Sequence, residues 1–288
     1  MPLLGSVECV GRPEVDLANP DSLRSGVRAS CPDVLINAAA YTAVDQAESE
    51  PDLAMKINGE APGVMAEEMK RRRGLMVHYS TDFVYDGSGT EPWVEDGPTA
   101  PVNEYGMAKI AGDKAVAAAA GAHLILRTSW VYGARGRNFL RTILRLAEAG
   151  KPLRVVDDQI GSPTWSRDIA TATVLIIDRL SWTRPDVSVS PAEHLAERSG
   201  IYHITSAGFV SWCGFAAAIL ENWQRLGSKI KAVPSLTPIT THDYPTPARR
   251  PGNSRLSNAK LKNTFGVLLP GWRHSLALVM QEIAECGC

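Results

Sequence analysis

Short apolar runs alternate with longer helical patterns through the first half of the chain. The apolar runs predict strands, which cover residues 7–10, 34–38, 75–80 and 124–129. A helical pattern over about 53–73, disturbed near Gly59 and Pro62, lies between two of these runs, and a further one begins after Asn103, a predicted helix cap. Such alternation is typical of βαβ units, whose strands lie parallel in one sheet. We therefore predict an α/β fold with a doubly wound parallel sheet.

The second half of the chain has a different pattern. Its predicted helices and extended runs cover about residues 138–149, 153–156, 166–180, 201–205, 211–226 and 272–285. A proline-rich run from Pro234 to Pro251 lies between the last two helices and is too broken for long regular structure. We expect two structural units. Residues 1–150 form the first, with 163–182 packing back on it, and residues 183–288 form a smaller α/β region.

Composition narrows the class of protein. The 288 residues are 44% hydrophobic and 21% charged, as in an ordinary folded domain, and the net charge of −1 indicates no attraction to nucleic acid. The five cysteines form no Cys-x-x-Cys pair and the six histidines show no metal-ligand spacing, so no metal site is predicted. No apolar stretch is long enough to span a membrane. We expect a cytoplasmic protein with neither a nucleic-acid nor a membrane partner.

Three side chains suggest a reaction. Thr81 closes an apolar run, and Tyr105 and Lys109 stand four residues apart, so they share one face of a helix. An ammonium beside a phenol lowers the pKa of the phenol, which then acts as general acid while a nicotinamide delivers hydride to a carbonyl. A Tyr-x-x-x-Lys pair alone also occurs by chance on surface helices. Together with Ser80-Thr81-Asp82 at a strand end, the catalytic interpretation is the stronger one.

Longer motifs carry a family resemblance. They are residues 36–45 (INAAAYTAVD), 78–87 (HYSTDFVYDG), 127–133 (RTSWVYG), 157–164 (DDQIGSPT) and 244–256 (YPTPARRPGNSRL). The first resembles a signature of extended short-chain dehydrogenases/reductases, and the set is similar to the dTDP-4-dehydrorhamnose reductases from about Leu4 to Glu282. The resemblance implies a Rossmann-type first unit that binds NAD(P) and a C-terminal unit that binds substrate.

The resemblance also implies a role for each matching residue. Thr81, Tyr105 and Lys109 would be the catalytic residues. NADPH or NADH would be held by Arg12, Asp16, Leu17, Ala38, Ala39, Ala40, Tyr41, Thr42, Tyr79, Tyr105 and Lys109. Gly11-Arg12 stands where an acidic residue would bind the adenosine ribose, and an arginine there favours NADPH.

A second set of residues would bind the dTDP-linked deoxysugar. It consists of Thr81, Asp82, Trp130, Arg250, Asn253 and Arg255. Two alternatives stay open at this point. Trp130 can equally be a core residue. Arg250, Asn253 and Arg255, in or just after the proline-rich run, can either contact the nucleotide diphosphate or be held by ordinary backbone hydrogen bonds of that loop.

The chain departs from the family in one respect. It has no Gly-x-x-Gly-x-x-Gly turn, whose backbone N–H groups bind pyrophosphate at a helix N-terminus. Alignment by eye places Leu3-Leu4-Gly5 at the end of the helix that follows this turn, so we expect the first βα unit to be missing. Either the natural protein is longer, or a true truncation has weakened cofactor binding.

The expected activity is reduction of the C4 carbonyl of dTDP-4-dehydro-β-L-rhamnose to dTDP-β-L-rhamnose, with NADPH or NADH. Phe83 stands where a sugar-nucleotide dehydratase would carry a glutamate, so reduction fits better than dehydration. The alternatives are a non-catalytic sugar-nucleotide-binding or regulatory subunit of the same fold, or an inactive truncated form. The oligomeric state stays open, with a homodimer among the options.

Overall fold

The computed structural model describes residues 4–182, 197–227 and 234–286. Its central element is a sheet of four parallel strands, in the order β1 (Val34–Asn37), β2 (Leu75–Thr81), β3 (His123–Thr128) and β8 (Gly200–His203). Asn37 lies opposite His78, and Thr81 lies opposite Thr128. The carboxyl ends of these strands therefore meet at one edge of the sheet.

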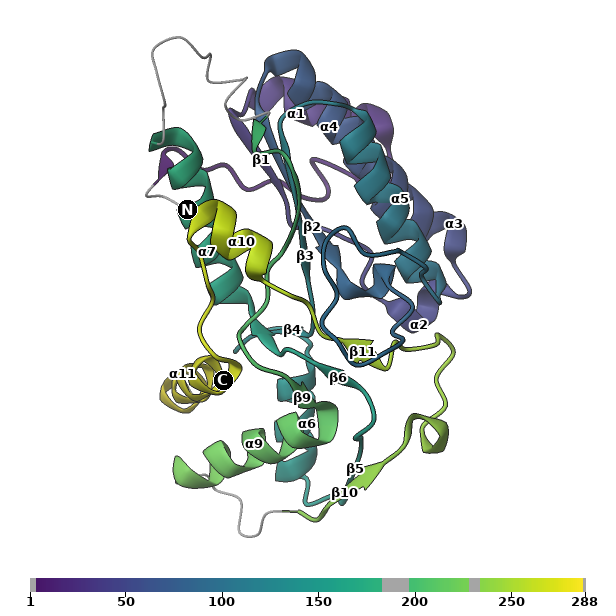
Figure 1. The fold of residues 1–288 in the computed structure, drawn as a ribbon, viewed down its shortest axis with the longest axis vertical. Coiled ribbons are helices and arrows are strands. Elements are labelled where there is room, and N and C mark those ends of the chain that lie inside the picture. Colours follow the sequence, from purple (N-terminus) through teal and green to yellow (C-terminus); the bar gives the residue numbers. More distant parts are fainter. Residues whose placement is uncertain (1–3, 183–196, 228–233, 287–288) are drawn as a thin grey trace.

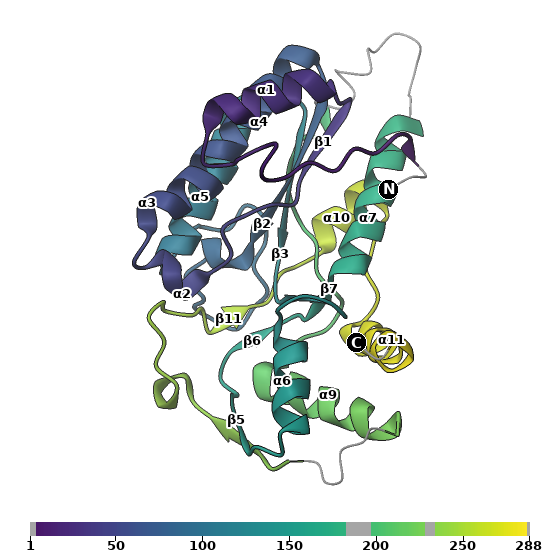
Figure 2. The same cartoon turned by 180° about the vertical axis from the view of Figure 1, so that it is seen from behind.

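Helices cover both faces of this sheet (Figure 1). One face packs on α1 (Pro20–Ser30), α4 (Ala61–Arg72) and α5 (Glu104–Ala118), and the other packs on α7 (Ser166–Trp182) and α10 (Ala259–Phe265). Figure 2 shows the same arrangement from behind. The predicted doubly wound parallel sheet is confirmed.

Alternation along the strands explains this layering. Met76 of β2 and Ile125 of β3 pack with α1 and α4, whereas their neighbours Val77 and Leu124 pack against α7 and α10. Successive strand residues point to opposite faces, so a strand buried on both faces is apolar throughout. On β2 the same alternation places His78 on the α5 face and Tyr79 on the α7 face.

The long helix predicted over residues 53–73 is present with the expected disturbance. It is built from α3 (Pro51–Ala54), the π-helical turn η2 (Met55–Glu60) and α4. A Cβ on Gly112 of α5 would lie 2.1 Å from the carbonyl oxygen of Asn58, so only glycine allows α5 to approach η2 this closely. The widened turn thus sits where α5 crosses it.

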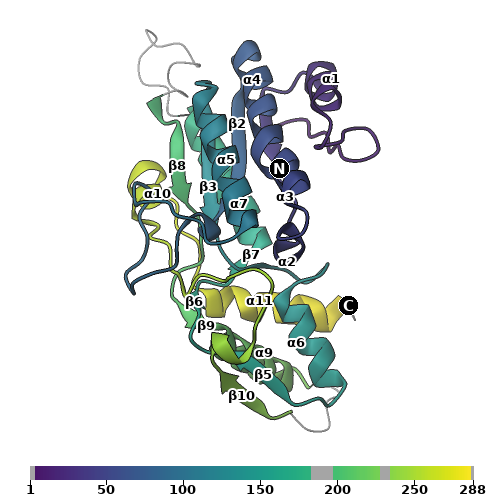
Figure 3. The ribbon, with the colours of Figure 1, turned by 90° about the vertical axis from the view of Figure 1, so that its right-hand side faces the viewer.

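A second hydrophobic core lies beside the carboxyl end of the sheet (Figure 3). It contains residues of α6 (Phe139–Glu148), α9 (Trp212–Arg225) and α11 (Trp272–Cys286), and of β5 (Leu153–Val156), which pairs in parallel with β10 (Leu236–Ile239). Helix α6 lies within the predicted unit 1–150 but packs in this core, while β8 and α10, from the predicted unit 183–288, pack on the first sheet. The proposed boundary at residue 183 lies outside the described residues.

Short strands join the two cores. They are β4 (Val131–Tyr132) with β7 (Thr164–Trp165), and β6 (Ile160–Gly161) between β11 (Asn253–Ser254) and β9 (Val210–Ser211). The chain crosses from one core to the other several times as a result. The connections lie close to the carboxyl ends of β2 and β3 (Figure 1).

Two expectations about elements differ from the structure. The predicted strand at residues 7–10 is wrong, because these residues are exposed and pair with no strand in the described part of the chain. A strand is stable only with a hydrogen-bonded neighbour. Helix α10 was not predicted; its seven residues are too few for a clear period. Within the described ranges, no helix is both long and apolar enough to cross a bilayer.

Candidate active site

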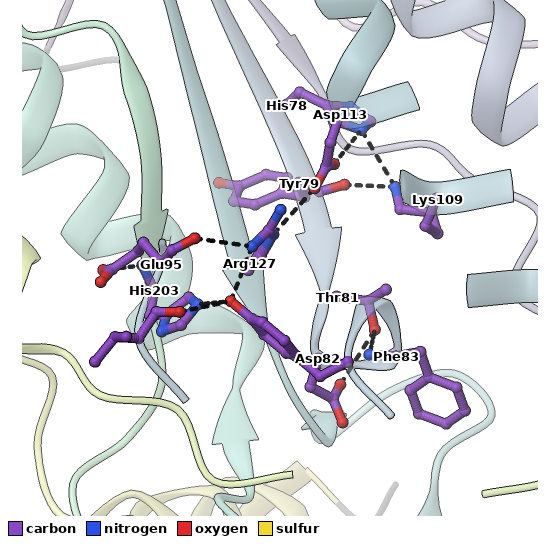
Figure 4. Close-up of polar contacts among 12 residues, drawn as sticks. His78, Tyr79, Thr81, Asp82, Phe83, Glu95, Lys109, Asp113, Arg127 and His203 are labelled. Atoms are coloured by element: carbon purple, nitrogen blue, oxygen red, sulfur yellow. Dashed lines mark hydrogen bonds and ion pairs between the residues drawn. The ribbon is translucent and has the colours of Figure 1, made fainter. Parts of the chain in front are cut away.

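The carboxyl end of β2 brings together two residues predicted to act on the substrate (Figure 4). Thr81 is the last residue of β2, and Asp82 begins the short helix η3 (Asp82–Val84). The Thr81 hydroxyl donates to Asp82 Oδ1 over 3.1 Å and accepts from the Phe83 N–H over 3.2 Å. Both residues are at most 6% exposed. Open α/β sheets bind ligands at this edge, so a fixed hydroxyl and carboxyl face the expected site.

Helix α5 places Tyr105 against the same strand end. Asn103 caps the helix, as predicted: its Oδ1 accepts from the Gly106 N–H over 2.8 Å, and its Nδ2 donates to the Arg249 carbonyl over 2.7 Å. A Cβ on Gly106 would lie 2.3 Å from the carbonyl oxygen of Phe83. The glycine after Tyr105 therefore lets the first turn of α5 rest directly on η3.

The Tyr105 phenol interacts with the Thr81 hydroxyl. Burial raises the pKa of Tyr105 to about 12, and Thr81 acts in the opposite direction. The Phe83 ring meets the Tyr105 ring edge-on, with centroids 5.5 Å apart. A phenol with this pKa keeps its proton at neutral pH, which is the form that a proton donor to an alkoxide requires.

Lys109 lies one helical turn further along α5 and is 2% exposed. Its Nζ donates to the carbonyl oxygen of Tyr79 over 2.6 Å and lies 3.4 Å from His78 Nε2. Burial lowers the pKa of Lys109 to about 8. The predicted lowering of the Tyr105 pKa by Lys109 is wrong for this structure, because burial dominates at Tyr105 and the ammonium bonds to the backbone instead.

Asp82 has an unmet hydrogen-bonding atom. Its Oδ2 is buried and has no hydrogen-bond partner among the described residues. Burial raises the pKa of Asp82 to about 6, although the hydroxyls of Ser254 and Thr81 act to lower it. A buried carboxylate oxygen without a donor costs free energy unless a ligand supplies the donor. This atom is therefore suited to accept from a hydroxyl group of a substrate.

Trp130 lies at the junction of the two cores. Its ring stacks on that of Trp212, with centroids 3.5 Å apart and planes 8° from parallel. A Cβ on Gly161 would lie 2.6 Å from the Trp130 ring, and the Trp130 backbone has a positive φ of 49°. Packing thus explains most of the position of Trp130, and contact with the sugar stays a prediction.

The three residues predicted to meet the diphosphate, in or just after the proline-rich run, are held by the protein itself. Arg250 pairs with Asp45 over 2.7 Å. Asn253 is 2% exposed, its Nδ2 donates to the carbonyls of Ser88 and Glu91, and its Oδ1 accepts from Arg255 Nη1 over 3.0 Å. These contacts favour the structural interpretation for Asn253. The two arginines keep further donors with which to meet an anion.

The segment Ala38–Thr42 follows β1 at the same edge of the sheet. Ala38 and Ala39 are exposed and small, so a flat ligand can approach the backbone there. The Ala39 N–H donates to Asn37 Oδ1 over 3.2 Å. The backbone N–H and C=O of Tyr41 are both bonded to the Asn58 side chain over 2.9 Å. The segment is therefore fixed in place before any ligand binds.

The remaining residues predicted for the cofactor have different surroundings. Asp16 accepts from the Ala18 N–H over 2.9 Å, and Leu17 packs against the core beneath α1. Arg12 is exposed. The Tyr79 hydroxyl bonds with Thr173 of α7 over 2.8 Å, so its side chain lies on the face opposite α5. None of these contacts reaches Tyr105, and the roles of these residues stay predictions.

The chain is also similar to proteins of known family. The family model described as RmlD substrate binding domain matches residues 5–285. A dTDP-4-dehydrorhamnose reductase of Burkholderia thailandensis is 47% identical over 98% of this chain and 92% of its own length. The Escherichia coli protein of the same name is 40% identical over 93% and 85% of the two chains.

The chain belongs to the RmlD family. A crystal structure of a dTDP-4-dehydrorhamnose reductase of Bacillus anthracis in complex with NADP matches it with a TM-score of 0.81 and 32% identity. The match covers 95% of this chain and 89% of that one. The sequence resemblance, and with it the Rossmann-type fold, is thereby confirmed.

This RmlD-family chain also has site residues that the sequence analysis missed. His78 and Asp113 lie beside Lys109, Asn58 fixes Tyr41, and Asp45 pairs with Arg250. Asp113 could have been found, because it stands four residues after Lys109 on the same face of the predicted helix. Asp45 ends the first motif, but nothing local in the sequence indicated its contact with Arg250 or that of Asn58 with Tyr41, since these partners are distant in the sequence.

Proposed function

We propose that this chain reduces the C4 carbonyl of dTDP-4-dehydro-β-L-rhamnose to dTDP-β-L-rhamnose, with NADPH or NADH as reductant. The observation that carries the proposal is the meeting of the Tyr105 phenol and the Thr81 hydroxyl at the carboxyl end of β2, one helical turn from Lys109. The relatives named above are dTDP-4-dehydrorhamnose reductases, and one of them was crystallised with NADP. Sequence, geometry and kinship point to the same reaction.

The protein's part in the reaction is proton transfer and positioning. When bound, the nicotinamide supplies a hydride to the sugar C4, and the carbonyl oxygen takes the negative charge. Tyr105 donates its phenolic proton to that oxygen, which forms the new hydroxyl. The Thr81 hydroxyl has one proton, so it turns from Asp82 Oδ1 to donate to the same oxygen and stabilise the developing charge. Lys109, as an ammonium, donates to the hydroxyls of the nicotinamide ribose and so positions the cofactor.

One structural observation supports cofactor binding at this edge of the sheet. The segment Ala38–Thr42, in which Ala38 and Ala39 are small and exposed and Tyr41 is held by Asn58, stands at the carboxyl end of β1, beside the strand that carries Thr81. We propose that this segment contacts the dinucleotide and that Lys109 holds the nicotinamide ribose. Arg12, Asp16, Leu17 and Tyr79 complete the proposed cofactor set.

The substrate contacts are proposed at three places. Asp82 Oδ2 accepts from a sugar hydroxyl, which would satisfy its unmet hydrogen bond. Trp130 packs beside the sugar. Arg250 and Arg255 bind the diphosphate, and Asn253 orients Arg255 through their 3.0 Å hydrogen bond.

Several finer statements stay predictions. They are a cofactor unit of residues 1–150 with 163–182, a substrate unit of residues 183–288, a cytoplasmic location, the lack of nucleic-acid binding, and a homodimer. The preference for NADPH rests on Arg12 alone. Binding titrations with NADPH and NADH on the folded chain would settle that preference.

The test of the proposed reaction is a pair of matched tyrosine variants. Tyr105→Phe should lower turnover by on the order of 100- to 10,000-fold, because the proton donor is lost. Tyr202→Phe is the control, since Tyr202 is also buried and donates to the Arg198 carbonyl away from the site. Near-normal turnover in Tyr105→Phe would overturn the proposal. A wild-type chain that binds the sugar nucleotide without reducing it would instead support a non-catalytic subunit.

A further inference from the structure

A buried polar cluster lies behind Lys109, between α5 and strands β2 and β3 (Figure 4). Its members are at most 2% exposed and are His78, Lys109, Asp113 and Arg127. The proposed reaction uses Lys109 and leaves the other three without a role. Buried charges are costly unless they are paired, so the pairing within this cluster decides the charge of Lys109.

Arg127 anchors one side of Asp113. Arg127 Nε donates to Asp113 Oδ2 over 3.0 Å, and its Nη1 donates to the Tyr85 hydroxyl over 2.8 Å. Tyr85 in turn bonds with His203 Nε2 over 2.8 Å and stacks on Trp93. The guanidinium is thus held from two directions, and it fixes the Asp113 carboxylate in one orientation.

The other oxygen of Asp113 faces Lys109 across the His78 ring. Asp113 Oδ1 has no hydrogen-bond partner among the described residues and lies 3.9 Å from His78 Nε2. The same nitrogen lies 3.4 Å from Lys109 Nζ. The imidazole therefore stands between the ammonium and the carboxylate, and the two charges interact through it.

Asn37 fixes the tautomer of His78. Asn37 Oδ1 accepts from the Ala39 N–H, so its Nδ2 is the atom that faces His78 Nδ1, 3.2 Å away. An amide nitrogen only donates, so Nδ1 accepts and the ring proton is on Nε2. Burial holds the pKa of His78 well below its usual value, so the ring is neutral. A protonated Nε2 cannot accept from the ammonium of Lys109, which turns to the Tyr79 carbonyl instead.

We propose that Asp113 is a positioning residue for the reaction: its carboxylate, anchored by Arg127 and acting across His78, keeps the buried Lys109 charged. The inference rests on the proposed function, in which a charged Lys109 holds the nicotinamide ribose. It extends the site to a residue that touches neither the substrate nor the cofactor.

The electrostatic balance supports this role. Burial lowers the pKa of Lys109 to about 8, and the charge of Asp113 is what opposes the burial. The charged and titratable groups around the pair are His78, Tyr79, Tyr85, Glu95, Tyr105 and Arg127. Without the Asp113 carboxylate, Lys109 would lose its proton at a lower pH.

Asp113→Asn tests the proposal, because it removes the charge and keeps the shape. Activity that needs a charged Lys109 falls as the pH rises through the Lys109 pKa. In Asp113→Asn, the alkaline fall of kcat/KM should move down by about one pH unit, while the rate at low pH stays close to wild type. The titration of Lys109, followed by NMR of isotope-labelled lysine in the full chain without cofactor, should move down equally. Lys109→Arg identifies the signal.

Two controls separate positioning from stability. Asp113→Glu keeps the charge and should restore the wild-type pH profile. Glu68→Gln removes another buried carboxylate. Glu68 lies on α4, away from the site, and pairs with Arg28 of α1 over 2.7 Å. This substitution should lower thermal stability without moving the profile. An Asp113→Asn protein with an unchanged profile and an unchanged Lys109 titration would overturn the proposal.

Two other results, a variant that does not fold and a wild-type chain without activity, still leave the proposal testable. If Asp113→Asn does not fold, Asp113→Ser also removes the charge and gives the same prediction: the Lys109 titration moves down, and an unmoved titration overturns the proposal. If the wild-type chain lacks reductase activity, the proposed function fails by itself. The NMR titration then still decides whether Asp113 sets the charge of Lys109.

Discussion

Two buried aspartates near the end of β2 show how differently one fold treats the same side chain. Asp82 and Asp113 are each 2% exposed. Each leaves one carboxylate oxygen without a hydrogen-bond partner in the described part of the chain. Asp113 pairs with Arg127 and lies in a cluster of opposite charges, whereas Asp82 meets hydroxyls and has no cation beside it in Figure 4. The compensated carboxylate belongs to the support of the site. The carboxylate without a cation stands at the carboxyl end of β2, the edge at which open α/β sheets bind ligands, and there we propose that a sugar hydroxyl supplies the missing donor.

Thr81 can likewise be compared with a buried threonine away from the site. Among the variants compared in this way, Thr81→Ala has the largest expected effect. Thr81→Ala should lower turnover by on the order of 100-fold, because a hydrogen-bond donor to the developing oxyanion is lost. Thr205, buried at the end of β8 and bonded to Asn258, is the matched position. Steady-state kinetics of both alanine variants make the comparison. Equal turnover in the two variants would mean that Thr81 is only structural.

Asp82→Asn should raise the free energy of unfolding and weaken binding of the sugar nucleotide. The pKa of Asp82 is about 6 in the folded chain and 3.8 as a free side chain, so the folded state binds the proton more tightly. The contribution of Asp82 to stability therefore falls as the pH rises from about 4 to about 6 and stays unfavourable above that range. At neutral pH, Asp82→Asn should raise the free energy of unfolding by on the order of 1–3 kcal/mol.

Denaturant unfolding of wild type and Asp82→Asn at several pH values measures this effect. The gap between the two proteins should close below about pH 4. The KM for the sugar nucleotide should rise in the variant, since Asp82 loses its charge. A variant that is less stable than wild type at neutral pH would show that the folded chain stabilises the charged Asp82 carboxylate. That result would contradict the comparison with Asp113.

Arg250 and Asp45 give the smallest effect and test the diphosphate contact. Their ion pair is partly exposed, so Arg250→Ala and Asp45→Asn should each change the free energy of unfolding by less than about 1 kcal/mol. Arg250→Ala should also raise the KM for the sugar nucleotide by about tenfold, because a guanidinium contact to phosphate is lost. Asp45→Asn should leave the KM near wild type. Equal KM changes would assign Arg250 a purely structural role.

The sequence predicted the parts of the site that depend on local patterns. Thr81 follows a continuous apolar run, and Asn103 stands where a helix cap is needed before Tyr105. The disturbance near Gly59 was also readable, since glycine and proline interrupt a helical pattern. These features follow from a few neighbouring residues and need no knowledge of the fold.

Contacts between distant segments could not be predicted from the sequence. Arg250 and Asp45 are far apart in the chain and meet only because the proline-rich run returns to the short helix α2 (Val44–Ala47), which follows β1 in the chain. The stacking of Trp130 on Trp212 depends likewise on the joining of the two cores. Burial misled the expectation for Tyr105: spacing to Lys109 predicted a lowered pKa, but the depth of the phenol, which raises the pKa, is a property of the fold.

Transfer of deuterium tests the central claim most directly. The folded wild-type chain is incubated with dTDP-4-dehydrorhamnose and NADPH that carries deuterium at the transferred position. The account predicts a dTDP-rhamnose product with one deuterium at C4 for each NADPH consumed, as read by NMR and mass spectrometry. A folded chain that binds both compounds yet places no deuterium at C4 would contradict it.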